Sequence, residues 1–270
     1  MRRTICIKLP RPGIPQELER SESHHLLSVL RLNIGDRVEA IDGRGGAAVT
    51  RLIESEGQIY LEFIEDLAPS DSQSRTESLP IEVVIAILKG DPMQWIVEKS
   101  AELGASRLIP LVTDHTVVKI DRKGPQAFQA RWQKIADQSL KQCGRLNRLL
   151  VEQPRSLDEF LKSSDTHGTT YRIWFDESLA GNHPDASHPT LLGVLNHKDV
   201  TIMSRVQLLV GPEGGWSQLE RQSIKAIVSP KTYPVSLGPV VLRAETAAIC
   251  ALSVAATIYR NKIHETTASL

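Results

Sequence analysis

The chain has 270 residues, 41% of them hydrophobic, and its 32 Lys and Arg residues are balanced by 32 Asp and Glu residues. These proportions exclude a wholly disordered chain, a fibrous chain and a generic polycation. Three cysteines without a Cys-x-x-Cys pair argue against a disulfide framework and a cysteine zinc site, and suit a reducing cytoplasm. Because no apolar stretch has the length of a membrane span or a signal sequence, we expect a cytoplasmic protein. The length of the chain suggests two domains.

Residues 1–68 show the pattern of a small β-barrel or sandwich. Short runs of alternating apolar residues are separated by turn-forming segments at 33–36, 42–46 and 56–57, and one helical segment at 23–30 interrupts them. Ile5, Ile7 and Leu9 form the first such run. A polar segment follows at 69–79, and its shortage of apolar side chains predicts a linker between two domains.

From residue 80 to residue 270 strands alternate with helices, a pattern typical of a mostly parallel α/β sheet covered by helices. The run Ile81–Leu88 is almost continuously apolar, as expected for a strand that is buried on both faces. Further strands are predicted at 107–112, 171–175, 207–210 and 232–235, and helices at 91–104, at 125–143, after Ser217 and at 244–260.

The predicted strand at 207–210 runs directly into Gly-Pro-Glu-Gly-Gly at 211–215. Ligands of open α/β sheets bind beyond the carboxyl ends of the strands, and glycines there let the backbone approach a ligand closely. The spacing fits neither the phosphate-binding loop nor the Gly-x-Gly-x-x-Gly dinucleotide motif. A tight strand-to-helix turn without a ligand explains the same glycines when this loop is considered alone.

A second glycine-bearing loop, Ser236–Leu242, leads into the last predicted helix, whose first residues include Arg243 and Glu245. If the two loops follow adjacent strands, they wall one pocket, with Leu237 and Leu242 as apolar lining and Arg243 as its cation. The alternative is a turn followed by an ion pair within the helix, which contributes little to stability.

Residues 119–148 hold an excess of basic side chains within the neutral chain. The basic residues are Lys119, Arg122, Lys123, Arg131, Lys134, Lys141, Arg145 and Arg148, and the acidic ones are Asp121 and Asp137. A basic face of this kind indicates binding to backbone phosphates, and a solvated helix face is the alternative. His183 and His188 have no acidic or cysteine partner at metal spacing, so no metal site is expected.

The two loops together closely resemble the RsmE family of small-subunit ribosomal RNA methyltransferases, which belongs to the SPOUT superfamily. The likeness is carried by Leu-Val-Gly-Pro-Glu-Gly-Gly-Trp-Ser at 209–217 and by Leu-Gly-Pro-Val-Val-Leu-Arg-Ala-Glu-Thr-Ala at 237–247. Lys-Gly-Asp at 89–91 with Glu-Leu-Gly at 102–104 resembles the first helix of the family's catalytic domain. His-Leu at 25–26 and Asp-Gly at 42–43 resemble its N-terminal domain.

The resemblance implies a PUA-like β-barrel at 1–68, and at 80–270 a SPOUT methyltransferase domain with a C-terminal trefoil knot and a homodimer interface. It implies S-adenosylmethionine as the cofactor and N3 of a uridine in small-subunit (16S) ribosomal RNA as the methylated atom, in free RNA or in the assembled subunit. Two alternatives stay open: a SPOUT enzyme that methylates a ribose 2′-oxygen, and a non-catalytic RNA-binding protein of the same fold. No metal and no membrane partner are expected.

The residues expected to hold the cofactor lie on the two loops and at the ends of the predicted strands at 171–175 and 207–210. They are Phe175, Leu209, Val210, Gly211, Glu213, Gly214, Gly215, Leu237, Gly238 and Leu242. Arg243 is expected to stabilise the uracil anion, and Glu213 or Glu245 to act as the base or to brace the loops. The candidate RNA contacts are Arg2, Arg31, Arg131, Lys134, Lys141 and Arg145.

One position departs from the family's pattern. The family commonly has arginine where this chain has Val240, so the role of that arginine is expected to pass to Arg243 or to a basic residue elsewhere.

Overall fold

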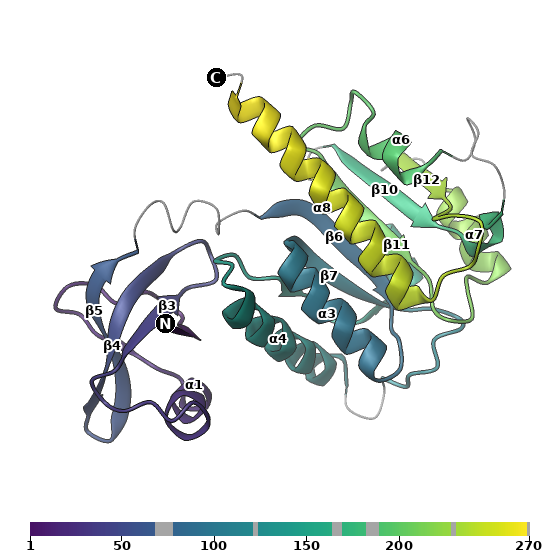
Figure 1. Ribbon diagram of the computed structural model, residues 1–270. Coiled ribbons are helices and arrows are strands. Elements are labelled where there is room, and N and C mark those ends of the chain that lie inside the picture. The colour runs from purple at the N-terminus through teal and green to yellow at the C-terminus, as the bar shows by residue number, and fades with distance from the viewer. Residues whose placement is uncertain (68–77, 121–123, 164–168, 182–188, 228–230, 269–270) are drawn as a thin grey trace. The chain divides into compact units, whose positions relative to one another are not determined.

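The computed structural model describes residues 1–67, 78–120, 124–163, 169–181, 189–227 and 231–268, which form two compact units (Figure 1). Unit 1 comprises residues 1–78 and 137–148, and unit 2 comprises residues 79–136 and 149–270. Most of the linker predicted at 69–79 lies outside the described residues. So do Asp121, Arg122, Lys123, His183 and His188.

Unit 1 is built on a five-stranded sheet in the order β1-β3-β4-β5-β2. Its strands are β1 (Arg2–Ile5), β2 (Gln16–Glu17), β3 (Arg37–Ile41), β4 (Ala47–Ser55) and β5 (Gln58–Asp66). A short helix, α1 (Arg20–His24), continues into one π-helical segment, His25–Val29, and buries Leu26 against Leu52 and Leu61 in the core of the unit. The β-rich character predicted for this region is confirmed. The first strand ends at Ile5, however, and leaves Ile7 62% exposed.

The last third of α4 (Gly124–Cys143), from Asp137 on, belongs to unit 1, whereas the predicted boundaries placed all of 80–270 in one domain. Leu140 and Leu146 pack against Ile41 of β3 in a small apolar cluster, and this packing joins the end of α4 to unit 1. Sequence periodicity could not show this division, because α4 carries one uninterrupted helical pattern.

The end of α4 is held by polar contacts to the sheet of unit 1. The Arg3 guanidinium donates to the Lys141 carbonyl at 3.1 Å, where a cation complements the helix dipole. Gly144 follows with a φ of 80°, the left-handed conformation that commonly ends a helix. The Arg148 amide then donates to the Gly43 carbonyl at 2.9 Å.

A partly buried ion pair joins α4 to α1 within unit 1. The Lys141 ammonium lies 2.7 Å from Glu22 Oε1, and the two side chains are 11% and 18% exposed. Glu22 Oε2 also accepts from the Thr4 hydroxyl at 2.8 Å and from the Ile5 amide at 3.4 Å. Burial alone would raise the pKa of the Glu22 carboxyl, but the bond and charge of Lys141 and these two donors together lower that pKa.

The lowered pKa of Glu22 makes unit 1 sensitive to acid. Its contribution to stability is present above the pKa of an unfolded glutamate and is lost as the pH falls through the lowered, folded value. At neutral pH we expect Glu22→Gln to destabilise unit 1 by about 1–3 kcal/mol, the cost of losing a charge-assisted hydrogen bond. The difference from wild type should shrink below about pH 4. Differential scanning calorimetry of both proteins at the two pH values checks this, and a pH-independent difference would contradict it.

Unit 2 contains a seven-stranded sheet in the order β12-β10-β11-β6-β7-β8, with β9 also paired to β7. Its strands are β6 (Leu79–Ala86), β7 (Ala105–Val112), β8 (Leu150–Val151), β9 (Arg155–Ser156), β10 (Thr170–Phe175), β11 (Arg205–Val210) and β12 (Lys231–Val235). All of these pairings are parallel, which confirms the predicted sheet type. The carboxyl ends of β12, β10 and β11 therefore lie side by side.

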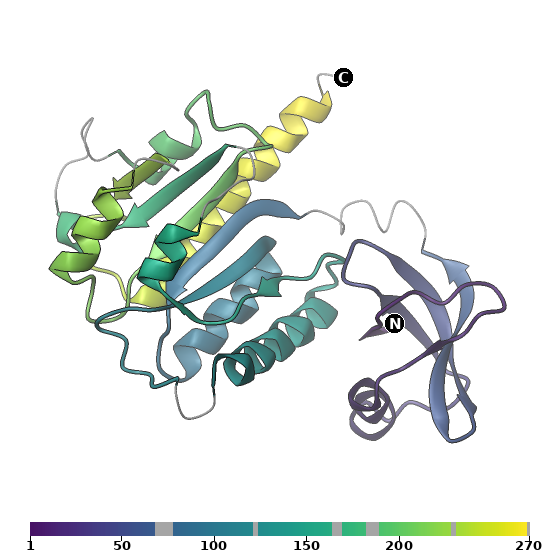
Figure 2. The ribbon, with the colours of Figure 1, turned by 180° about the vertical axis from the view of Figure 1, so that it is seen from behind.

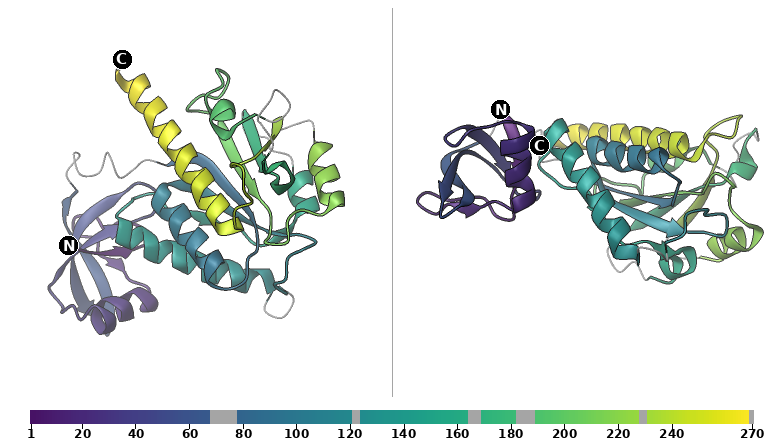
Figure 3. Two further views of the ribbon diagram at one scale, coloured as in Figure 1. Left: turned by 45° about the vertical axis from the view of Figure 1, so that its right-hand side comes forward. Right: turned by 90° about the horizontal axis from the view of Figure 1, so that it is seen from below.

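Helices cover both faces of this sheet (Figures 1 and 2). One face packs against α3 (Asp91–Leu103), the first half of α4, α6 (Leu191–Leu195) and α8 (Ala244–Ala268), as the views in Figure 3 also show for α3 and α8. The other face packs against α5 (Leu157–Lys162) and α7 (Gln218–Lys225). Within the described ranges no helix combines the length and the apolarity of a membrane span.

Alternate side chains of the central strands enter the two faces. In β11, Leu208 and Val210 pack on the side of α8, while Leu209 packs with Trp216 on the side of α7. This two-sided burial explains the almost continuous apolar runs in the sequence. The trefoil knot implied by the resemblance stays a prediction.

A buried row of polar side chains crosses the sheet in register. Arg172 of β10 donates to Gln207 of β11 at 3.0 Å, and Gln207 donates to Glu82 of β6 at 3.0 Å. Glu82, only 3% exposed, also lies 3.4 Å from the guanidinium of Arg205 and 3.8 Å from that of Arg107. Because a slipped register would leave these buried groups without partners, the row specifies the alignment of the strands.

Candidate active site

A cavity of about 260 Å³ opens at the carboxyl ends of three neighbouring strands of unit 2. β10 ends at Phe175, β11 at Val210 and β12 at Val235, and all three residues line the cavity. This is the edge of a parallel sheet at which ligands bind. The other lining residues are Asp176, Glu177, Ala180, Gly211, Pro212, Glu213, Gly215, Ser236, Leu237, Val240, Val241, Leu242, Arg243, Ala244 and Ala247.

One wall is the loop at 211–217, called here the first loop, which Trp216 anchors. The Trp216 side chain is 1% exposed, and its indole N–H donates to the Phe175 carbonyl at 3.0 Å. A Cβ at Gly211 would lie 2.9 Å from the Trp216 ring, so a side chain there would displace the anchor. Ser217 then caps α7 through reciprocal bonds with Glu220 at 3.2 and 2.8 Å, which confirms the predicted capping box.

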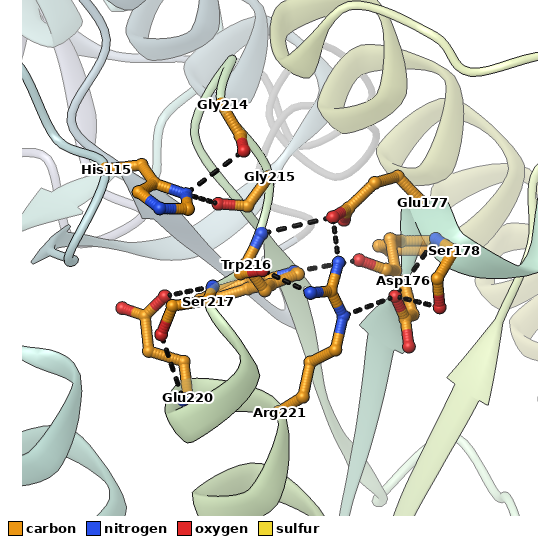
Figure 4. A network of polar contacts seen from close by, with 11 residues as sticks. His115, Asp176, Glu177, Ser178, Gly214, Gly215, Trp216, Ser217, Glu220 and Arg221 are labelled. Atoms are coloured by element: carbon orange, nitrogen blue, oxygen red, sulfur yellow. Dashed lines mark hydrogen bonds and ion pairs between the residues drawn. The ribbon is translucent and has the colours of Figure 1, made fainter.

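A histidine that does not line the cavity contacts the glycines of the first loop, as Figure 4 shows. His115 Nδ1 lies 3.0 Å from the Gly214 carbonyl and 2.8 Å from the Gly215 carbonyl. Because both partners are acceptors, Nδ1 carries the proton in this arrangement. A Cβ at Gly214 would lie 3.1 Å from the His115 Cβ, so the imidazole packs closely on the glycine backbone.

Gly215 requires the conformation that glycine alone adopts readily. Its φ is 70°, and a Cβ built on it would overlap the carboxylate of Glu177. The absence of a side chain thus lets Glu177, from the loop after β10, lie against the main chain of the first loop.

The opposite wall is the loop at 236–243, called here the second loop. Ser236 Oγ donates to the Gly238 carbonyl at 2.9 Å and accepts from the Gly238 amide at 3.3 Å. Val240 and Val241 are 64% and 65% exposed although they line the cavity, so its rim is apolar on this side. The Arg243 carbonyl accepts from the Ala247 amide at 2.9 Å, which places Arg243 at the start of α8.

Most of the predicted cofactor residues line this one cavity. Phe175, Val210, Gly211, Glu213, Gly215, Leu237 and Leu242 all do so. Leu209 is instead fully buried in the sheet, because alternation along β11 turns it toward α7. Gly214 and Gly238 lie on the two loops but are not lining residues.

The predicted catalytic and RNA-contacting residues are placed as follows. Arg243 and Glu213 are exposed and line the cavity, whereas Glu245 is half-buried in the first turn of α8 and does not line it.

Four of the predicted RNA contacts are exposed: Arg2, Arg31, Arg131 and Lys134. Lys141 is engaged by Glu22, and Arg145 is half-buried.

Asp176, Glu177 and Arg221 form a polar network that the sequence interpretation missed (Figure 4). Asp176 and Glu177 directly follow β10 and line the cavity, and Arg221 of α7 pairs with both carboxylates. The signal available in the sequence was the acidic pair at the end of the 171–175 strand, since strand ends carry ligand sites in parallel sheets. Nothing in the sequence pointed to Arg221.

Two family models match the chain. The RNA methyltransferase domain matches residues 75–256, and the RNA methyltransferase PUA domain matches residues 18–64.

Among relatives, ribosomal RNA small subunit methyltransferase E of Synechocystis is 30% identical over 87% of this chain and 71% of the relative. The protein of the same name from Bacillus subtilis is 29% identical over 86% of each chain. The structure of ribosomal RNA small subunit methyltransferase E from Neisseria gonorrhoeae, bound to S-adenosylmethionine, is 25% identical with a TM-score of 0.77. The match covers 96% of this chain and 98% of that one. A Legionella pneumophila protein in complex with the same cofactor has 30% identity and a TM-score of 0.75, over 94% and 96% of the two chains.

Proposed function

Because the chain belongs to the RNA methyltransferase family, we propose that it methylates N3 of a uridine in small-subunit (16S) ribosomal RNA. It is an enzyme of the class that uses S-adenosylmethionine to methylate ribosomal RNA. The observation that carries the uridine proposal is the position of Arg243, a cation that ends the second loop, directly precedes α8 and lines the cavity.

The lining of the cavity fits the cofactor. Phe175, Val210 and Leu237 offer an apolar surface for an adenine ring, and the bare backbone at Gly211 and Gly215 lets amides and carbonyls approach a ligand. Asp176 and Glu177 also line the cavity and share the single positive charge of Arg221, so one net negative charge stays beside the cavity and favours a cationic ligand. When bound, S-adenosylmethionine supplies an electrophilic methyl group on a positively charged sulfur.

The residues around the cavity would activate the uracil. N3 of uracil carries a proton and becomes a nucleophile only after losing it. We propose that Arg243 stabilises the resulting anion, which lowers the pKa of the bound base. Glu213 is the proposed acceptor of the N3 proton, because it lines the cavity and Glu245 does not.

Transfer of radioactive methyl groups tests the proposed activity. Wild-type protein with labelled S-adenosylmethionine should label small-subunit RNA, supplied either free or as assembled subunits. Comparison of these two substrates shows which form is used. A protein that binds the cofactor but labels neither form would support the non-catalytic alternative.

We propose further that the protein acts as a cytoplasmic homodimer, as the resemblance implies. The proposed cytoplasmic location rests on the ribosomal RNA substrate. Light scattering of the purified protein tests the homodimer, because it measures the mass of the protein in solution.

Exposed basic side chains would hold the RNA through its phosphates. Arg131 and Lys134 lie on the solvent side of α4 in unit 2, and Arg2 and Arg31 are exposed in unit 1. Lys141 is not part of this proposal, because Glu22 already neutralises its charge. Arg145 stays a candidate although it is half-buried.

Replacing Arg131 or Lys134 with alanine should weaken RNA binding at low salt. Each substitution is expected to reduce the slope of log K against log[salt] by about 1, because one phosphate contact is lost. Lys162→Ala is the matched control, since Lys162 is an exposed lysine that already pairs with Asp158 at 2.6 Å. Fluorescence anisotropy over a salt series measures the slopes, and equal slopes for all four proteins would contradict the assignment.

A further inference from the structure

The guanidinium of Arg221 contacts two segments of the cavity wall (Figure 4). Arg221 itself is not among the residues that line the cavity. Arg221 lies in α7, and its side chain is 24% exposed. Its Nε donates to Asp176 Oδ1 at 3.1 Å, while Nη2 pairs with the Glu177 carboxylate and Nη1 donates to the Trp216 carbonyl. Arg221 thus contacts the segment after β10 and the first loop, which follows β11, at the same time.

The contacts of Glu177 and Trp216 show what this cation holds in place. Glu177 Oε1 also accepts from the Trp216 amide at 3.2 Å, and the Trp216 indole reaches back to the Phe175 carbonyl. The Glu177 carboxylate lies against the main chain of Gly215, at the place that a Cβ of this residue would occupy. The position of this carboxylate therefore sets the position of Gly215 and Trp216.

Charge explains why an arginine is needed at this point. Asp176 is 3% exposed and adjoins Glu177, so two neighbouring carboxylates lie at one strand end. The Ser178 amide and hydroxyl donate to Asp176 Oδ1 at 3.1 and 2.8 Å, but they add no positive charge. A buried carboxylate beside a second one is costly without a cation, and Arg221 supplies a cation to both.

We propose that Arg221 is a positioning residue of the cofactor site: by fixing Asp176 and Glu177 against Trp216, it holds the segment after β10 and the first loop in the arrangement that binds S-adenosylmethionine. This inference rests on the proposed function, because it assumes that the cavity takes that cofactor. Arg221 does not line the cavity, so its loss should raise the KM for the cofactor and leave kcat at saturating cofactor close to wild type.

Isothermal titration with S-adenosylmethionine tests the proposal. Arg221→Met keeps an unbranched side chain but removes the charge and the donors. Its dissociation constant should rise about tenfold, because part of the binding free energy is then spent on ordering the segment after β10 and the first loop. Lys225→Met is the matched control, because Lys225 is an exposed cation of the same helix that does not line the cavity. Its affinity should match that of wild type.

Two further variants keep the test decisive. Arg221→Lys retains the charge but has a single nitrogen, so it should bind the cofactor more weakly than wild type and more tightly than Arg221→Met. If Arg221→Met does not fold, the comparison of Arg221→Lys with wild type decides the question. Glu177→Gln should weaken binding in the wild-type background and have little further effect in the Arg221→Met background.

The outcomes separate the inference from the proposed function. Wild-type affinity in both Arg221 variants, even with a lower melting temperature, would overturn the positioning role alone. A wild-type protein that does not bind S-adenosylmethionine would overturn the proposed function and this inference together.

Discussion

Replacing Arg243 with alanine is expected to slow methyl transfer by about 10²–10³-fold, the loss typical of removing one donor to a developing anion. Arg243 lines the cavity, and its contact to the Ala247 amide uses the backbone carbonyl, which alanine retains. The start of α8 should therefore be preserved and the affinity for S-adenosylmethionine should stay close to wild type. Single-turnover rates measure the effect, and the rate of the variant should rise more steeply with pH because the bound uracil, without the cation, keeps a higher pKa at N3.

Two related variants define the role of the charge. Arg243→Lys should keep part of the rate, since it retains the cation without the planar group. Val240 also lines the cavity, at the position where the family commonly has arginine, so adding Val240→Arg to Arg243→Ala should restore part of the lost rate. If Arg243→Ala binds the cofactor normally and transfers methyl groups at the wild-type rate, the assignment of Arg243 is wrong.

Replacing Gly215 with alanine should weaken S-adenosylmethionine binding by about 10- to 100-fold, which corresponds to the roughly 1–3 kcal/mol typical of an overpacked site. The new Cβ would overlap the Glu177 carboxylate, and the φ of 70° is unfavourable for alanine. The Glu177 carboxylate would have to move away, and its bonds to the Trp216 amide and to Arg221 would be lost. Isothermal titration measures the change in affinity.

Gly13→Ala is a matched control for Gly215→Ala. Gly13 has a φ of 74° but nothing within 4 Å of the Cβ position, and it lies in unit 1. Both substitutions place an alanine at a positive φ, but only Gly215→Ala lies at the cavity and collides with Glu177. Gly13→Ala should lower stability by about 1 kcal/mol and leave cofactor binding unchanged. Similar affinities for the two variants would show that the packing at Gly215 does not matter.

The parts of the site that the sequence predicted are those encoded by local pattern. The apolar runs at Ile81–Leu88 and 207–210 indicated two-sided burial, and burial on both faces is what the parallel sheet provides. The glycines at 211–215 and Arg243 were recognisable because ligands gather at the carboxyl ends of strands. Both loops do line the one cavity.

The parts that could not be predicted depend on contacts between distant segments. Arg221 and Glu177 are 44 residues apart, and only the fold shows that the Arg221 guanidinium pairs with the Glu177 carboxylate. Glu22 and Lys141, 119 residues apart, form an ion pair for the same reason, and this took Lys141 out of the predicted RNA-binding set. The number of basic residues at 119–148 gave the local excess of positive charge, but it could not show which side chains form ion pairs.

The methylated atom is the central claim, and nucleoside mass spectrometry tests it most directly. Small-subunit RNA lacking the modification would be treated with the wild-type protein and S-adenosylmethionine, digested to nucleosides and compared with authentic standards, with the Arg243→Ala variant treated in parallel. The proposed function predicts one product, 3-methyluridine, which is present after wild-type treatment and strongly reduced with the variant. A 2′-O-methylated nucleoside, or no methylated nucleoside from a protein that binds the cofactor, would contradict it.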